Sequence, residues 1–196
     1  MPILMIMDIE GGTAEQYDRV DGLLGHLTLE NAPAGLISHA AAVTDTGFMV
    51  ADVWESAEDL QRFFDERLDA AITEAGLPQA EPRILPVHNH IEGSGDESAA
   101  LVLIELDGFT TDDYDAITGE MEAHAGDGSG HPAVAHVVGA TDKGLVVVDI
   151  WESGEAFARF GETELAPRMG DRMAGVQPRV SQVHNHIRVK APAAAG

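Results

Sequence analysis

The sequence repeats itself with a period of about 97 residues, as the distance from Trp54 to Trp151 shows. The segment 53–56 (VWES) returns at 150–153 as IWES, and the segment 87–91 (VHNHI) returns unchanged at 183–187. Both tryptophans and both tyrosines of the chain occupy matched positions. Solenoid repeats are roughly 20–50 residues long, so a unit of this length is expected to be a complete small domain.

The repeat fixes the expected domain boundaries. We expect a first repeat at 1–92, a linker at 93–99, a second repeat at 100–188 and a frayed tail at 189–196. The linker is polar and rich in glycine, which is typical of connecting segments, and the tail has no apolar pattern to bury.

Each repeat has the same predicted order of elements, β-α-β-β-α-β. Thr13 is a plausible N-cap for the first helix, and Ser56 for the second. Asp45 and Thr46 lie between two apolar runs, which indicates a hairpin turn. The expected segments in the first copy are strands at 3–9, 36–43, 48–54 and 82–91 and helices at 13–27 and 57–68. This order predicts an α+β fold of two tandem ferredoxin-like units.

The composition excludes several classes of function. There are 34 Asp and Glu against 11 Lys and Arg, a formal charge of −23, so neither nucleic acid nor an anionic membrane is an expected partner. The absence of cysteine excludes disulfides, thiolate nucleophiles and iron–sulfur clusters. The apolar run at 1–7 is followed by Asp8 and Glu10, which favours a strand over a signal peptide, and we expect a cytoplasmic protein.

A ferredoxin-like sheet has helices on one face only, so its other face needs a partner. We expect the two repeats to cover each other and to form one pseudo-twofold α/β barrel. Because side chains alternate along a strand, those of the third strand can be assigned to its two faces. Met49, Ala51 and Val53 are expected to pack against the helices, and Phe48, Val50, Asp52 and Trp54 to face the interior of the barrel.

The first candidate site pairs a histidine with an aspartate across the hairpin. If Asp45 and Thr46 form a two-residue turn, His39 lies opposite Asp52, and His136 lies opposite Asp149 in the second copy. A carboxylate that orients an imidazole suits general-base catalysis. A cross-strand pair that only stabilises the sheet explains the same residues, by roughly 0.2–1 kcal/mol.

The second candidate site is the His-X-His sequence of the last strand of each repeat. Alternation predicts that His88 and His90 point together into the interior, as do His184 and His186. They could then bind a ligand or, with a further residue, a transition metal. This spacing alone does not predict a metal site, and no cofactor is expected.

The aromatic residues, and the histidines with no counterpart in the other repeat, lead to further hypotheses. Trp54 and Trp151 could form a wall for a flat ligand, or could belong to the core. Tyr17 and Tyr114 are expected to anchor the apolar face of the first helix of each repeat. His26, His124 and His131 have no counterpart in the other repeat and are expected at the surface.

A strand-turn-strand that ends in Trp-Glu-Ser, after a segment such as Ala32-Pro33-Ala34-Gly35, resembles the dimeric α/β-barrel superfamily. Within it the sequence is similar to the antibiotic-biosynthesis-monooxygenase group, here with both halves of the barrel in one chain. The resemblance implies a cofactor-independent monooxygenase or isomerase that acts on an aromatic or polyketide-like small molecule. Two alternatives stay open: a non-catalytic ligand-binding or stress-related protein, and a histidine-rich metal or haem protein. The expected partner is a small molecule, and the expected state is a monomeric pseudo-dimer that could form a further homodimer.

Overall fold

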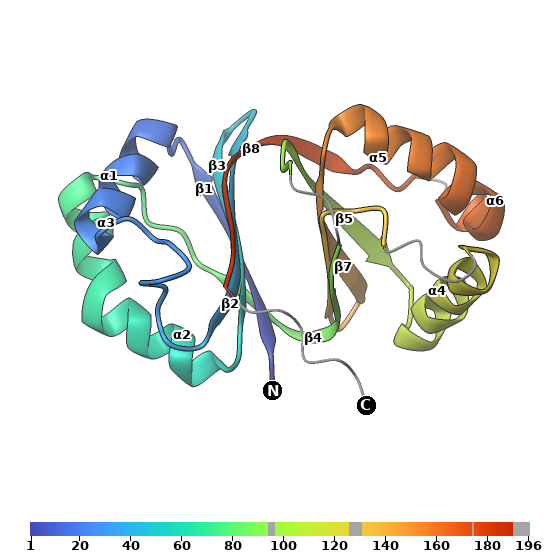
Figure 1. Ribbon diagram of the computed structural model, residues 1–196, viewed down its shortest axis with the longest axis horizontal. Coiled ribbons are helices and arrows are strands. Elements are labelled where there is room, and N and C mark those ends of the chain that lie inside the picture. The colour runs from blue at the N-terminus through green and yellow to red at the C-terminus, as the bar shows by residue number, and fades with distance from the viewer. Residues whose placement is uncertain (94–96, 126–130, 174, 190–196) are drawn as a thin grey trace. The chain divides into compact units, whose positions relative to one another are not determined.

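The computed structural model describes residues 1–93, 97–125, 131–173 and 175–189. The central part of the predicted linker and the tail from residue 190 lie outside this range. Contacts divide the chain into two compact units: Met1–Pro86 with the segment that starts at Ser181, and Val87–Val180. The boundary therefore falls inside β4 and β8, and each unit contains the VHNHI segment of the other sequence repeat. Figure 1 labels the helices and strands of both units.

Each sequence repeat follows the predicted order of elements. The first repeat contains β1 (Ile3–Glu10), α1 (Ala14–Leu24), β2 (Leu36–Thr44), β3 (Gly47–Trp54), α2 (Ala57–Phe63), the π-helical turn η1 (Phe64–Leu68), α3 (Asp69–Ala75) and β4 (Arg83–Glu92). The second contains β5 (Ala100–Asp107), α4 (Thr111–Ala125), β6 (Ala135–Ala140), β7 (Gly144–Trp151), α5 (Gly154–Phe160), the π-helical turn η2 (Gly161–Leu165), α6 (Ala166–Met169), the 3₁₀ turn η3 (Gly170–Met173) and β8 (Arg179–Arg188).

The local signals in the sequence explain where these elements begin. Thr13 caps α1 and forms a capping box with Gln16, and Ser56 and Ser153 cap α2 and α5. Gly47 closes the β2–β3 hairpin at a point where a Cβ atom would collide with the carbonyl oxygen of Ile9. Only glycine fits such a close approach of two backbones.

The paired strands within each unit run antiparallel. In the first unit β3 lies between β1 and β2, and β2 also pairs with the end of β8. In the second unit β7 lies between β5 and β6, and β6 also pairs with the end of β4. The hydrogen-bonded strand order is β1-β3-β2-β8-β5-β7-β6-β4, and it closes on itself. The predicted fold class, two tandem ferredoxin-like repeats in one α/β barrel, is confirmed.

The predicted assignment of strand faces is wrong. In the first unit Phe48 packs on Tyr17 of α1, and Trp54 packs on Phe63 of α2, so this set of side chains lies on the face that the helices cover. Met49, Ala51 and Val53 lie on the opposite face and are also buried. Because both faces of the sheet are buried, apolar character does not distinguish them.

Candidate functional site

The predicted pair of His39 and Asp52 lies on the helix-covered face of the first unit. The β2–β3 register places the two residues opposite each other, which confirms the pairing expected from a two-residue turn. His39 Nδ1 lies 2.7 Å from Asp52 Oδ1, and both residues are buried. The carboxylate oxygen accepts a hydrogen bond, so Nδ1 carries the hydrogen and Nε2 of the neutral ring is an acceptor. The pair therefore faces α1, and the prediction that it faces the interior of the barrel is wrong.

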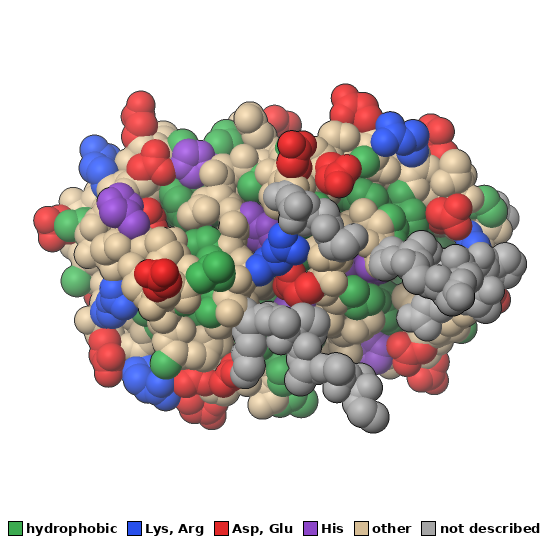
Figure 2. Space-filling view, viewed as in Figure 1, with side chains coloured by type: hydrophobic (Ala, Val, Ile, Leu, Met, Phe, Trp, Pro, Cys, Tyr) green, Lys and Arg blue, Asp and Glu red, His purple; other side chains and the backbone are tan. Residues whose placement is uncertain are grey.

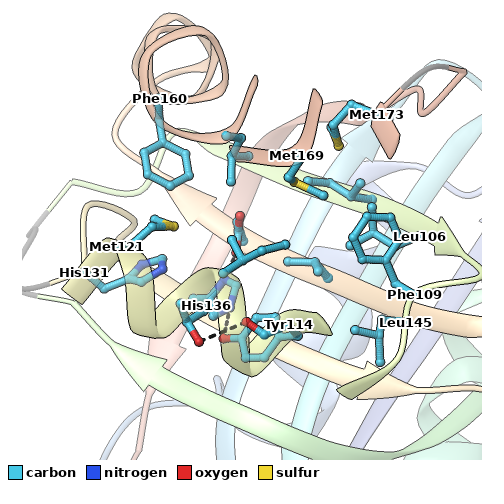
Figure 3. Close-up of a pocket in the computed structure, with 16 residues that line it drawn as sticks. Leu106, Phe109, Tyr114, Met121, His131, His136, Leu145, Phe160, Met169 and Met173 are labelled. Carbon is cyan, nitrogen blue, oxygen red and sulfur yellow. Dashed lines mark hydrogen bonds and ion pairs between the residues drawn. The ribbon is translucent and has the colours of Figure 1, made fainter. Parts of the chain in front are cut away.

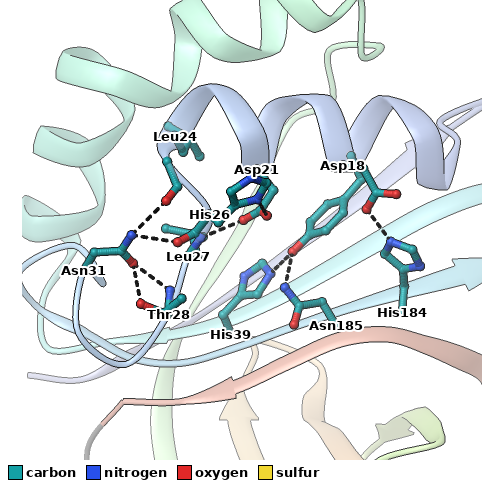
Figure 4. A network of polar contacts seen from close by, with 12 residues as sticks. Asp18, Asp21, Leu24, His26, Leu27, Thr28, Asn31, His39, His184 and Asn185 are labelled. Carbon is teal, nitrogen blue, oxygen red and sulfur yellow. Dashed lines mark hydrogen bonds and ion pairs between the residues drawn. The ribbon is translucent and has the colours of Figure 1, made fainter.

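A tyrosine from α1 completes this group. The hydroxyl of Tyr17 lies 2.7 Å from His39 Nε2, to which it donates, and its oxygen accepts from Asn185 Nδ2 at 2.9 Å (Figure 4). Burial raises the pKa of Tyr17, so the hydroxyl keeps its proton at neutral pH. We call Tyr17, His39 and Asp52 the first triad.

The second unit contains the same group. His136 Nδ1 lies 2.6 Å from Asp149 Oδ1, and His136 Nε2 lies 2.8 Å from the hydroxyl of Tyr114. Asn89 Nδ2 donates to the tyrosine oxygen at 2.8 Å. We call Tyr114, His136 and Asp149 the second triad. The sequence predicted that both tyrosines lie on the first helix of their repeat, but not that they take part in the site. Their matched positions in the two repeats were the one signal that could have indicated it.

A β-bulge brings the asparagine of each VHNHI segment onto its triad. In β4 the register shifts between Val87 and Asn89, so His88 is an extra residue. As a result His88 and Asn89 both face α4, where His88 bonds Asp115 at 2.7 Å. His90 pairs with Val137, the neighbour of His136, and so lies on the opposite face, where it bonds Glu92 at 2.8 Å. The prediction that His88 and His90 point together is wrong, because the bulge shifts the alternation by one residue.

The β8 segment behaves in the same way. The register with β2 shifts around His184, which bonds Asp18 of α1 at 2.6 Å (Figure 4). His186 pairs with Ala40, the neighbour of His39, and therefore lies on the face opposite the first triad. Neither His-X-His sequence offers two imidazoles to one metal ion. Within the described residues, no group of three or more His, Asp or Glu side chains could hold a metal.

Both tryptophans belong to the core. Trp54 is fully buried, and Trp151 packs on Phe157 and Phe160 with ring centroids 5.7 and 5.2 Å apart. Phe160 itself lines the cavity described below, so Trp151 supports a wall residue instead of forming the wall.

The second triad lies in the wall of a cavity between the sheet and the helices of the second unit (Figure 3). The space open to the centre of a water molecule is about 70 Å³, where one water needs roughly 10–15 Å³. Most of the wall is apolar and includes Ile104, Phe109, Met121, Leu145, Met169 and Met173. Its polar residues are Tyr114, Thr118, His131, His136 and Asp149. An apolar cavity with a few converging polar groups is typical of a small-molecule site.

His131 lines the cavity and is partly buried, whereas the sequence predicted a position at the surface. Its ring lies against that of His136, with centroids 4.5 Å apart, and points toward the cavity in Figure 3. Burial lowers the pKa of His131 to about 4, so the ring is neutral at pH 7. His26 is exposed, as expected, and the side chain of His124 lies outside the described residues.

The first triad has different surroundings. Phe48 stacks on Tyr17 with ring centroids 5.0 Å apart, and the repeat places Leu145 at the matched position in the second unit. The smaller Leu145 lines the cavity beside the second triad. The two units therefore keep the same polar group but differ in the space beside it.

Comparison with solved structures gives matches over the whole chain. A candidate monooxygenase from Fusobacterium nucleatum superposes with a TM-score of 0.66 at 10% identity, covering 94% of this chain and 93% of that one. A candidate monooxygenase from Lactobacillus acidophilus gives 0.63 at 12% identity, covering 97% of both chains. An anthrone oxidase-like protein gives 0.55 at 14% identity, covering 100% of this chain and 95% of that one.

The chain has the dimeric α/β-barrel fold. The structure of a candidate chlorite dismutase shares this fold, with a TM-score of 0.55 at 11% identity over 94% of this chain and 95% of that one. No protein-family model matches the sequence, and neither does any curated protein. At identities of 10–14%, these similarities show the dimeric α/β-barrel fold and do not show the activity. In the described part of the chain, no helix is long and apolar enough to cross a membrane.

Proposed function

We propose that this protein is a cofactor-independent monooxygenase or isomerase that acts on an aromatic or polyketide-like small molecule. The observation that carries the proposal is the second triad in the wall of an apolar cavity. A base whose imidazole is oriented by a carboxylate can accept a proton from a bound molecule, and the apolar wall suits a flat, weakly polar ligand.

The hydrogen bonds define a path for that proton. Tyr114 donates its hydroxyl proton to His136 Nε2, and the imidazolium that forms is held by Asp149 through Nδ1–H. The tyrosine oxygen, which also accepts from Asn89, then takes the acidic proton of the substrate. His136 and Asp149 are the catalytic pair of the second unit, and His39 and Asp52 are its counterpart in the first.

The carbanion that this step leaves has two outcomes. With dioxygen as the oxidant, one CH₂ group and one O₂ become one C=O group and one water, which is a monooxygenase reaction. Without dioxygen, return of the proton to a different carbon gives an isomer. Anthrone is a suitable test substrate, since it has an acidic CH₂ group between two aromatic rings and one structural neighbour is anthrone oxidase-like.

The experiment compares two matched variants, Tyr114→Phe in the second triad and Tyr17→Phe in the first. Oxygen uptake with anthrone is measured for the wild type, both variants and a protein-free control. A second assay follows exchange of the CH₂ protons in deuterated water by NMR. We expect Tyr114→Phe to lower the rate by about 10²-fold or more and Tyr17→Phe to leave it near the wild-type rate. Equal rates for the wild type and the protein-free control in both assays would reject an activity on this substrate.

A non-catalytic ligand-binding protein is the second candidate. It is favoured by the complete set of hydrogen bonds in each triad, since a fully bonded polar group can serve structure alone. Binding of an aromatic ketone without oxygen uptake or proton exchange would decide for this candidate.

A further inference from the structure

The geometry points to His131 as the residue that binds the carbonyl oxygen of the ligand in the second unit. This inference adds a recognition role to the proposed function and rests on it for the site. It concerns a residue outside both triads.

The loop before β6 fixes the orientation and the tautomer of His131. The backbone N–H of Ala133 donates to His131 Nδ1 at 3.3 Å, so Nδ1 is unprotonated. A neutral imidazole with an accepting Nδ1 carries its hydrogen on Nε2. Contact with the ring of His136 holds the plane of His131 beside the second triad.

The Nε2–H of His131 is available to a ligand. The other side-chain donors of the cavity wall are occupied: Tyr114 donates to His136, His136 donates to Asp149, and the Thr118 hydroxyl donates to the backbone oxygen of Tyr114. Among the described side chains of the wall, His131 alone has an N–H or O–H group with no acceptor among the described residues. A donor in an apolar cavity favours a ligand with a matching oxygen acceptor, because a purely apolar ligand leaves the donor without a partner.

The donor also suits the proposed chemistry. Removal of a proton next to a conjugated carbonyl moves negative charge onto the carbonyl oxygen. A fixed N–H group at that oxygen stabilises the anion as it forms. The first repeat has Ala34 at the position 97 residues before His131, and alanine has no side-chain donor. His131 therefore makes the second unit the one that recognises the ligand.

The test measures binding of two small probes that differ in one oxygen atom, 1-tetralone and tetralin. Isothermal titration calorimetry is carried out on the full chain as wild type, His131→Ala, His131→Gln and His26→Ala. Gln keeps an N–H donor, and His26→Ala removes an exposed histidine from the first unit as a control. Circular dichroism of each variant checks that it is folded.

We expect the wild type to bind 1-tetralone about 10-fold or more tightly than tetralin, which is the effect of one hydrogen bond. His131→Ala should remove most of this preference, while His131→Gln and His26→Ala should keep it. The inference is overturned if His131→Ala keeps the wild-type preference, or if the wild type has no preference or binds neither probe. If the wild type prefers 1-tetralone and His131→Ala loses this preference, but neither oxygen uptake nor proton exchange is seen, the role of His131 is supported and only the catalytic proposal is rejected.

Discussion

His39 and His136 have the same hydrogen-bond partners but different surroundings. Each imidazole is buried between an aspartate and a tyrosine, so removing either one leaves a buried carboxylate without its donor. The cavity lies beside His136. Replacing either histidine is therefore expected to lower stability, whereas only replacing His136 is expected to abolish turnover.

Substitution tests this difference directly. His39→Ala and His136→Ala should each lower the free energy of unfolding by about 1.5–3 kcal/mol, the range for a hydrogen bond to a charged group. Urea denaturation followed by circular dichroism measures the loss. Turnover should be lost in His136→Ala and retained in folded His39→Ala. The reverse result would place the active site in the first unit.

The lowered pKa of His131 predicts a dependence of stability on pH. The unfolded chain binds a proton at this residue near pH 6.5, but the folded protein binds it only near pH 4. Acidification from pH 6.5 to pH 4 therefore favours the unfolded state, by at most about 3 kcal/mol from this residue. His131→Gln should lose less stability than the wild type over this range in thermal melts. An equal loss would show that His131 does not titrate in this way.

At the scale of elements, Arg172 connects η3 to the start of α4. Its guanidinium donates to Asp113 at 2.9 Å and lies 4.1 Å from the ring centroid of Phe109. This hydrogen bond holds the pKa of the Asp113 carboxyl well below its ordinary value. Phe109, Met169 and Met173 all line the cavity, so the connection helps to keep the cavity covered.

Loss of this connection should loosen η3. Arg172→Ala is expected to speed amide hydrogen exchange in the segment Gly170–Met173 by about 5-fold, since it removes an exposed ion pair and a cation–π contact. Arg62→Ala removes a similar exposed ion pair from the first unit and is the control. Unchanged exchange in Arg172→Ala would show that η3 is held by its methionines alone.

The order of the elements could be predicted from the sequence, whereas their faces could not. The repeat, the caps at Thr13 and Ser56 and the two-residue turn are local signals, and they gave the fold and the pairing of His39 with Asp52. Strand parity failed because apolar side chains are buried on both faces of the sheet. The bulge at His88 has no local signal such as glycine, so nothing in the sequence indicated that Asn89 reaches Tyr114.

At the scale of the whole molecule, the dominant property is the formal charge of −23. Asp and Glu side chains are scattered over the face shown in Figure 2 and are not gathered in one patch. Repulsion among them destabilises the compact state, and salt screens it over about 8 Å at physiological ionic strength. The melting temperature should therefore rise between dilute buffer and 1 M NaCl. A constant or lower melting temperature would contradict this.

The central claim is that the second unit holds the ligand site, with Tyr114 and His131 at the ligand. The most direct measurement is a crystal structure of the full chain with bound 1-tetralone. We predict the ketone in the cavity of the second unit, with its oxygen within hydrogen-bond distance of His131 Nε2 and its ring against Leu145 and Met169. A ketone bound beside Tyr17 in the first unit, or bound outside the cavity, would contradict the account.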